Sequence, residues 1–137
     1  MCLSSYTVHM VMYVFSHFAF EGEKMSVHPA LVHLIQGLHQ QGKPQGFICV
    51  APVIAAKVIQ GSCVTVGQDP DTAGVIESMG GHHRETRVEE FCVDDINNII
   101  TTPAYMDSDA GISDIAVGIE GLVNTVLERV QSPVTTY

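Results

Sequence analysis

The clearest pattern of hydrophobic and polar positions lies near the C-terminus. Over residues 112–130, apolar side chains return every three or four positions, which predicts an amphipathic helix of about five turns. Asp107 and Asp109 favour the N-terminus of this helix and Arg129 its C-terminus, because those charges oppose the helix dipole. Pro133 limits any continuation.

Shorter patterns upstream predict alternating helices and strands. In chain order they are a helix over 29–42 capped by Ser26, a strand over 46–50, a helix over 52–61, a strand over 63–66, a helix capped by Asp71 or Thr72 that ends at Gly80, two strands over 86–88 with 91–93, and a last strand over 99–102. This alternation favours an α/β fold, with a largely parallel sheet covered by helices on both faces. Ligands of such folds bind at the carboxyl ends of the strands, where Cys49 is expected.

Composition and charge narrow the class of partner. The 137 residues suit one domain, and 46% of them are apolar, which is enough to form a core. Six Lys and Arg face 15 Asp and Glu, for a formal charge of −9, so nucleic acid and anionic membranes are excluded as partners. The apolar run over 8–20 contains His9, Ser16 and His17, and no Lys or Arg precedes Lys24. The chain therefore shows no membrane span, secretory signal or mitochondrial transit peptide.

Cys49 is the first candidate for chemistry, because it stands between a strand and a helix. At a helix N-terminus, free N–H groups and the helix dipole favour thiolate over thiol, and we expect Cys49 to be ionised near neutral pH. The N–H of Val50 would then face an oxyanion formed by attack on a carbonyl. The alternative is a buried cysteine that only packs. Cys2, Cys63 and Cys92 are expected to be such packing residues in a reducing compartment.

His82 and His83 follow Gly80-Gly81 and could place an imidazole near Cys49 as a base. The alternative for both is a solvated loop histidine. His82, His83 and Cys92 also suggest zinc, but their spacing fits no common site and a fourth ligand is missing. We therefore expect no metal and no cofactor.

Several motifs together resemble a known superfamily. The run Gly42-Lys43-Pro44-x-Gly46-Phe47-x-Cys49-x-Ala51-Pro52 resembles the cysteine elbow of the DJ-one/PfpI superfamily, and more narrowly the ElbB branch with its eukaryotic ES-one mitochondrial relatives. Further matches are Ala55-Ala56-Lys57, Val64-Thr65-Val66-Gly67, the run over 80–83 and Thr101-Thr102-Pro103-Ala104-Tyr105-Met106. The similarity covers residues 15–130, leaving 1–14 unplaced and 131–137 as a tail.

The resemblance implies a flavodoxin-like three-layer sandwich, in which Cys49 is the reactive thiol and His83 (or His82) the nearby imidazole. It implies a mitochondrial, intracellular location and glyoxalase-like or hydrolytic chemistry on small carbonyl compounds. Val50 stands where PfpI-type proteases carry histidine, and Ala51 where true glutamine amidotransferases carry glycine. Neither of those two activities is therefore expected.

The same resemblance implies that strand–helix units found at the start of such domains are lacking. Those units supply a glutamate beside the cysteine and a glycine-rich oxyanion loop. We expect an open sheet edge with adjoining apolar surface, marginal stability and impaired turnover. Self-association as a homodimer is left open. The alternative function is a non-catalytic redox-sensing or interaction protein.

Overall fold

Two sets of paired strands form the middle of the fold. In the computed structural model, which describes residues 22–131, β1 (Gln45–Ile48) pairs in parallel with β5 (Ile99–Thr102). On its other side β5 pairs antiparallel with β4 (Cys92–Asp94). β2 (Cys63–Val64) pairs in parallel with β3 (His82–His83). Two of these three pairings are parallel, which confirms the α/β fold with a mostly parallel sheet.

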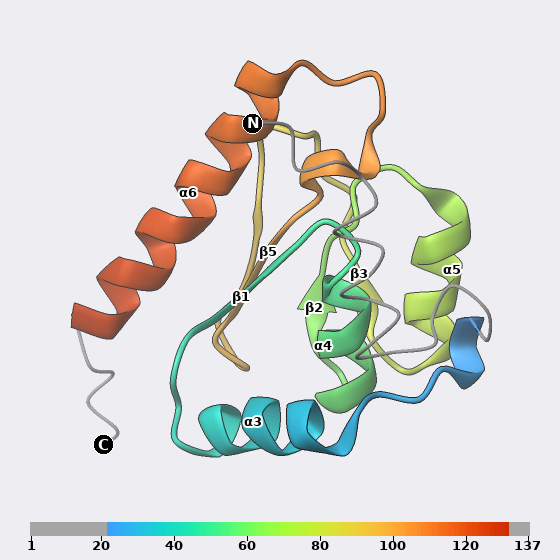
Figure 1. The fold of residues 1–137 in the computed structure, drawn as a ribbon, viewed down its shortest axis with the longest axis vertical. Helices are drawn as coiled ribbons and strands as arrows, with labels where there is room; N and C mark the ends of the chain where they lie inside the picture. The colour runs from blue at the N-terminus through green and yellow to red at the C-terminus, as the bar shows by residue number, and fades with distance from the viewer. Residues whose placement is uncertain (1–21, 132–137) are drawn as a thin grey trace.

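Helices cover the strands on two sides (Figure 1). Helix α6 (Ile112–Gln131) runs along β1 and β5 on one side, and α4 (Pro52–Val58) lies on the other with α3 (Pro29–Gln40) and α5 (Pro70–Ser78) around it. Two short 3-10 helices, η1 (Gly22–Lys24) and η2 (Ala104–Met106), complete the described elements. This arrangement agrees with the predicted three layers. None of the described helices has the length and apolar character needed to cross a membrane.

A hydrogen bond from backbone to side chain joins the two strand sets. The N–H of Thr65, just after β2, donates to Thr101 Oγ1 in β5 over 2.9 Å. The hydroxyls of Thr65 and Thr86 are 2.8 Å apart, and all three threonines are buried. Since a buried N–H without a partner is costly, the Thr101 hydroxyl replaces the strand pairing that ends at Val64. We call this junction the seam.

Helix α4 is the most deeply buried helix and fixes the position of the segment before it. Its residues from Pro52 to Ala56 are all buried, and they pack in one cluster with Val64, Val66, Ile76 and Ile99. A helix that is apolar all round is stable only inside a protein, so α4 is held between neighbouring elements. The turn that leads from β1 into α4 is therefore also held.

Helix α6 approaches the strands closely through glycine. A Cβ added at Gly118 would lie 2.3 Å from Val88 O and 2.8 Å from Thr102 Oγ1. A Cβ at Gly121 would lie 2.4 Å from the ring of Phe91. The helical period found α6 from its apolar positions, but it gave no indication of this contact.

Several sequence predictions differ from the structure in detail. The predicted strand over 86–88 is wrong, because Arg87 and Glu90 close a turn there: the N–H of Glu90 donates to Arg87 O, and that of Arg87 to Glu90 Oε2. His82 and His83 form a strand instead. The cap of α3 is His28, not Ser26, and the cap of α5 is Asp69, not Asp71 or Thr72.

The surface of α6 keeps a row of exposed apolar side chains: Ile112, Val117, Val123, Leu127 and Val130. Within residues 22–131, β1 has a strand neighbour on one side only. The domain division at residue 14 lies outside the described residues, and the expected marginal stability stays a prediction.

We expect Gly118→Ala to destabilise the fold, because its methyl group would meet backbone oxygen and a buried hydroxyl. A loss of about 1–3 kcal/mol is typical of such overpacking. Gly37→Ala is the matched control: Gly37 lies inside α3 with nothing within 4 Å of the added Cβ, and we expect a gain of about 0.5–1 kcal/mol. Urea unfolding of both variants measures the difference, and equal stabilities would contradict the close contact.

Asp94 ties the turn between β4 and β5 to β2. Its Oδ2 accepts from the Cys63 N–H and from Asn97 Nδ2, both over 2.8 Å, and its Oδ1 accepts from the N–H groups of Ile96 and Asn97. Burial of this side chain raises its pKa, but the four hydrogen bonds outweigh burial and hold the pKa of Asp94 below its usual range.

We therefore expect Asp94→Asn to lower the free energy of unfolding by about 1–3 kcal/mol at pH 7. A lowered folded-state pKa gives stability that is present above the unfolded pKa and lost as pH falls through the folded value. The gap between the wild type and Asp94→Asn should thus narrow below about pH 4. Denaturant titrations at pH 7 and at pH 3 measure it. A gap independent of pH would show that the Asp94 charge contributes nothing.

Candidate functional site

Cys49 lies in a strained turn between β1 and α4. Its φ of 66° falls in the left-handed region, which non-glycine residues rarely adopt. The Ala51 N–H donates to Ile48 O over 3.2 Å and closes the turn, while the Cys49 N–H donates to Thr102 O over 3.1 Å. Glycine would fit this turn without strain, so a cysteine here points to a role for the thiol.

A second strained residue stands beside the first. Ala104, which begins η2 after β5, has a φ of 45°. Because β1 and β5 are parallel and Ile48 pairs with Thr102, the two strands end at the same edge. The two left-handed residues thus lie at neighbouring strand ends, and non-glycine strain of this kind gathers at functional sites.

Two backbone N–H groups face the thiol. Those of Val50 and Tyr105 both donate hydrogen bonds to Cys49 Sγ. Val50 was expected from the elbow. Tyr105 was missed, because only the register of β1 and β5 brings residues 103–106 to the thiol. The TTPAYM motif was the available signal, although sequence alone did not place it.

The expected ionisation of Cys49 is not what the structure gives. Burial raises the pKa of the thiol above its ordinary value, and the hydrogen bonds from Val50 and Tyr105 oppose this rise only in part. Two local features weaken the expected help from the helix: α4 has seven residues, and Pro52 at its start carries no N–H. Cys49 is therefore mainly a thiol at neutral pH, and the prediction of a thiolate is wrong.

His83 is placed at the end of β3, which pairs with β2 and not with β1. Its Nε2 accepts a hydrogen bond from the Val66 N–H over 3.3 Å. Burial lowers the pKa of His83, and the carboxylates of Glu77, Glu85 and Asp69 raise it in part, so the ring is mainly neutral at pH 7. Its role as the base for Cys49 stays a prediction. His82 is exposed, 4.0 Å from Glu77.

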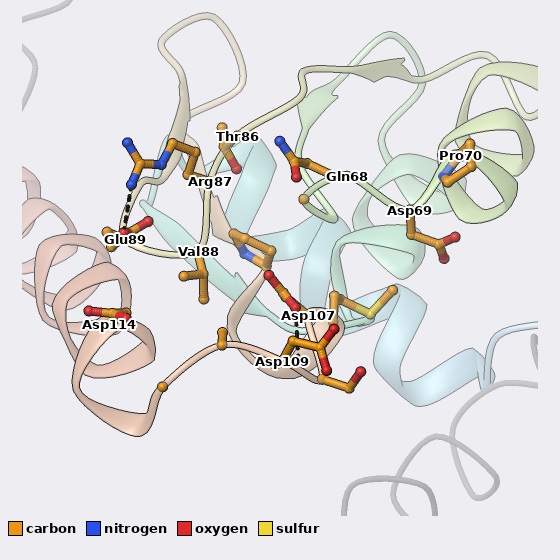
Figure 2. A pocket seen from close by; sticks show the side chains of 16 residues that line it. Gln68, Asp69, Pro70, Thr86, Arg87, Val88, Glu89, Asp107, Asp109 and Asp114 are labelled. Atoms are coloured by element: carbon orange, nitrogen blue, oxygen red, sulfur yellow. Dashed lines mark hydrogen bonds and ion pairs between the residues drawn. The ribbon is translucent and has the colours of Figure 1, made fainter.

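A cavity of about 680 Å³ is lined in part by residues at the two ends of η2 and in the loop that follows it (Figure 2). Its lining combines the starts of α5 and α6, the loop over 86–89, and Pro103 and Met106 on either side of Ala104 and Tyr105; Cys49 does not line it. The lining carries five carboxylates and one guanidinium: Asp69, Glu89, Asp107, Asp109 and Asp114, and Arg87.

Four of these six charged side chains already have partners, namely Arg87, Glu89, Asp107 and Asp69. Arg87 pairs with Glu89 over 3.0 Å, and Asp107 Oδ1 accepts from the Asp109 N–H. Asp69 accepts from the Thr72 hydroxyl and caps α5. The surplus of negative charge disfavours an anionic ligand in this cavity. Across residues 22–131, no three His, Cys, Asp or Glu side chains are grouped so as to hold a metal ion.

Comparisons with known proteins agree with the fold. A solved structure of an isoprenoid biosynthesis protein with an amidotransferase-like domain, from Ehrlichia chaffeensis, superimposes with a TM-score of 0.70 at 24% identity, over 77% of this chain and 49% of that one. The chain is therefore an α/β protein of amidotransferase-like fold. No family model matches it.

Curated relatives narrow the class further. Over 122 residues, 82% of the chain, it is 38% identical to the mitochondrial glutamine amidotransferase-like class 1 domain-containing protein 3 of Homo sapiens and 36% identical to the mitochondrial ES1 protein homolog of Rattus norvegicus. It is 26% identical to the mitochondrial ES1 protein of Danio rerio over 132 residues. The chain is thus a relative of the ES1 proteins, which confirms the predicted resemblance. It spans about half the length of these relatives, 45–49%.

The raised pKa of Cys49 gives a direct test. We expect iodoacetamide to alkylate Cys49 more slowly at pH 7 than an unfolded cysteine, with the midpoint of the pH–rate curve above that of the unfolded chain, because only the thiolate reacts. Site-resolved mass spectrometry measures the rates between pH 6 and 11. The urea-unfolded chain is the control, whose midpoint should return to about 8.5. A folded midpoint below the unfolded one would instead support the thiolate inferred from sequence.

Proposed function

We propose that Cys49 is the nucleophile of a reaction on small carbonyl compounds, of the glyoxalase-like or hydrolytic kind. The observation that carries this proposal is a strained cysteine whose sulfur receives two backbone N–H groups. A packing cysteine needs neither the strain nor the donors. Similarity to ES1 proteins supports the fold and the family, while the activity is inferred from the elbow.

The chemistry follows from the positions of these groups. The sulfur adds to the aldehyde carbon of a 2-oxoaldehyde, and the carbonyl oxygen takes the proton that the thiol loses. Within this hemithioacetal, the C–H proton then moves to the neighbouring carbonyl carbon and the hydroxyl proton moves to the oxygen of that carbonyl, giving a thioester of a 2-hydroxy acid. Water releases the acid and restores the thiol. The N–H groups of Val50 and Tyr105 are placed to stabilise negative charge at the sulfur or at the oxygen beside it.

Proton transfer is the slow part of this scheme. A thiol with a raised pKa needs a base, and His83 is the residue proposed for that role. In the described arrangement its Nε2 holds the Val66 N–H, so this hydrogen bond has to break before His83 accepts a proton there. We therefore propose weak turnover for this chain.

A second candidate function is a non-catalytic interaction or redox-sensing protein. The observation in favour of interaction is the exposed apolar row on α6, since soluble proteins rarely leave such a row without a partner. We propose a mitochondrial location under either function, because the names of the three relatives describe them as mitochondrial.

Formation of lactate from methylglyoxal tests the catalytic proposal. We expect a slow but measurable rate that falls at least about tenfold in Cys49→Ser, because a hydroxyl is a far weaker nucleophile than a sulfur. Cys63→Ser, assayed in reducing buffer, is the matched control and should keep the rate. Equal rates for the wild type and Cys49→Ser would remove Cys49 from the mechanism. Absence of any turnover by the wild type would favour the interaction function.

A further inference from the structure

Two thiols remote from each other in sequence meet at the seam. Cys63 in β2 and Cys92 in β4 are 29 positions apart, and their sulfur atoms are 3.7 Å from each other. Both are free thiols; Cys92 is fully buried and Cys63 half-buried. From the sequence, Cys63 and Cys92 were predicted to be separate packing residues, since nothing in their spacing predicts that β2 and β4 come together.

Backbone contacts hold both residues in place. Cys92 lies opposite Thr101 in the antiparallel pairing of β4 with β5, and Cys63 lies opposite His82 in the parallel pairing of β2 with β3. The Cys63 N–H also donates to Asp94 Oδ2 over 2.8 Å, two residues beyond Cys92. The contact between the sulfurs is therefore set by strands and not by the chance position of a loop.

We propose that Cys63 and Cys92 form a reversible intramolecular disulfide when the protein meets peroxide, at a site separate from Cys49. The sulfurs have to approach from 3.7 Å to about 2.05 Å. Rotation about the side-chain bonds, with a small movement of β2 toward β4, supplies this distance. In the described sheets β2 and β4 are not paired with each other. No ladder of backbone hydrogen bonds between these two strands therefore restricts this movement.

The half-buried position of Cys63 makes it the sulfur that meets the oxidant. Its sulfur displaces hydroxide from hydrogen peroxide to give a sulfenic acid, and the thiol proton leaves with that hydroxide as water. The Cys92 sulfur then attacks the sulfenic sulfur, the S–S bond forms, and a second water departs. In total the two thiols lose two electrons and two protons, and the peroxide is reduced to two waters.

The ionisation of Cys92 agrees with this order. Burial and the neighbouring Cys63 raise the pKa of Cys92 to about 12, so Cys92 carries little of the thiolate that attacks peroxide. Asp94 also raises this pKa, while Arg84 lowers it. Cys63, the more exposed sulfur, is therefore the first to be oxidised, and Cys92 reacts afterwards with the sulfenic acid beside it.

The disulfide would form on oxidation and would also stabilise the fold. It would close a loop that contains α5 and β3, and so restrict the unfolded chain. It would also tie β2 to β4 covalently, beside the hydrogen bonds that run from Thr65 to Thr101 and from Cys63 to Asp94 between the two strand sets.

Peptide mapping of the oxidised full chain tests this proposal. The chain, with Cys2→Ser to exclude cross-links through the N-terminal segment, is treated with a small excess of hydrogen peroxide, blocked with iodoacetamide and digested without reduction. We expect one linked peptide pair, 63 with 92, lighter than its parts by two hydrogen atoms, together with equal loss of labelling at both cysteines. Dithiothreitol should restore both labels. The melting temperature of the oxidised form should exceed that of the reduced form by roughly 10 °C.

Three variants sharpen the result. Cys49→Ser should form the same cross-link, whereas Cys63→Ser and Cys92→Ala should both abolish it and the rise in melting temperature. Full labelling of Cys63 and Cys92 after peroxide, or disulfides between chains in their place, would overturn the proposal whether or not either variant folds. Loss of methylglyoxal turnover bears on Cys49 alone, so the two proposals fail separately.

Discussion

The parallel register between β1 and β5 is the constraint on which the site depends. Pairing Ile48 with Thr102 ends both strands at one level, so the turn at Cys49 and the turn at Ala104 face each other. A shift of one residue would reverse which faces the side chains of β1 meet, and the buried Gln45 would exchange with the exposed Gly46. The register thus keeps the buried side chains of β1 in the core and keeps the two backbone N–H groups next to the thiol.

The ionisation of Cys49 shows how competing effects are weighed at such a turn. A helix N-terminus contributes roughly 0.3–1 kcal/mol, which corresponds to less than one pKa unit. Desolvation of a buried group shifts a pKa by up to about 3–5 units. Sequence reasoning counted the first effect and could not count the second, because the burial of residue 49 depends on the tertiary packing around it. The elbow therefore positions the sulfur well but does not ionise it, and its reactivity depends on a base.

Local patterns predicted most elements and few of the contacts between them. The period of apolar residues located α6 and α3, and the short apolar runs located β1 and β5. The predicted strand over 63–66 also contains β2, but β3 has two residues, too short to show alternation, and its pairing with β2 joins segments 19 positions apart. Caps were misplaced by two or three residues because Ser26 and His28, or Asp71 and Asp69, are all able to accept from a helix N–H.

At the candidate site, too, the sequence predicted residues that are neighbours in the chain and missed contacts between distant segments. Cys49 and Val50 are neighbours in the chain, so the elbow was visible in the sequence. Tyr105, the contact of Cys63 with Cys92 and the approach of Gly118 to Val88 all depend on how distant segments pack. The position of His83 on β3 likewise follows from a strand that no pattern predicted.

β5 is the element that the elbow and the seam share. On one side its Thr102 carbonyl accepts from Cys49, and on the other its Thr101 hydroxyl accepts from Thr65 while Thr101 opposes Cys92. All four residues of β5 are buried, and both edges of the strand are paired, so it has no free edge along which to slide. A disulfide between Cys63 and Cys92 would add rigidity on the side of β5 away from Cys49, and β5 is already fixed by its pairing on both edges. The reaction proposed at Cys49 and the disulfide proposed between Cys63 and Cys92 are therefore independent, although one strand supports both sites.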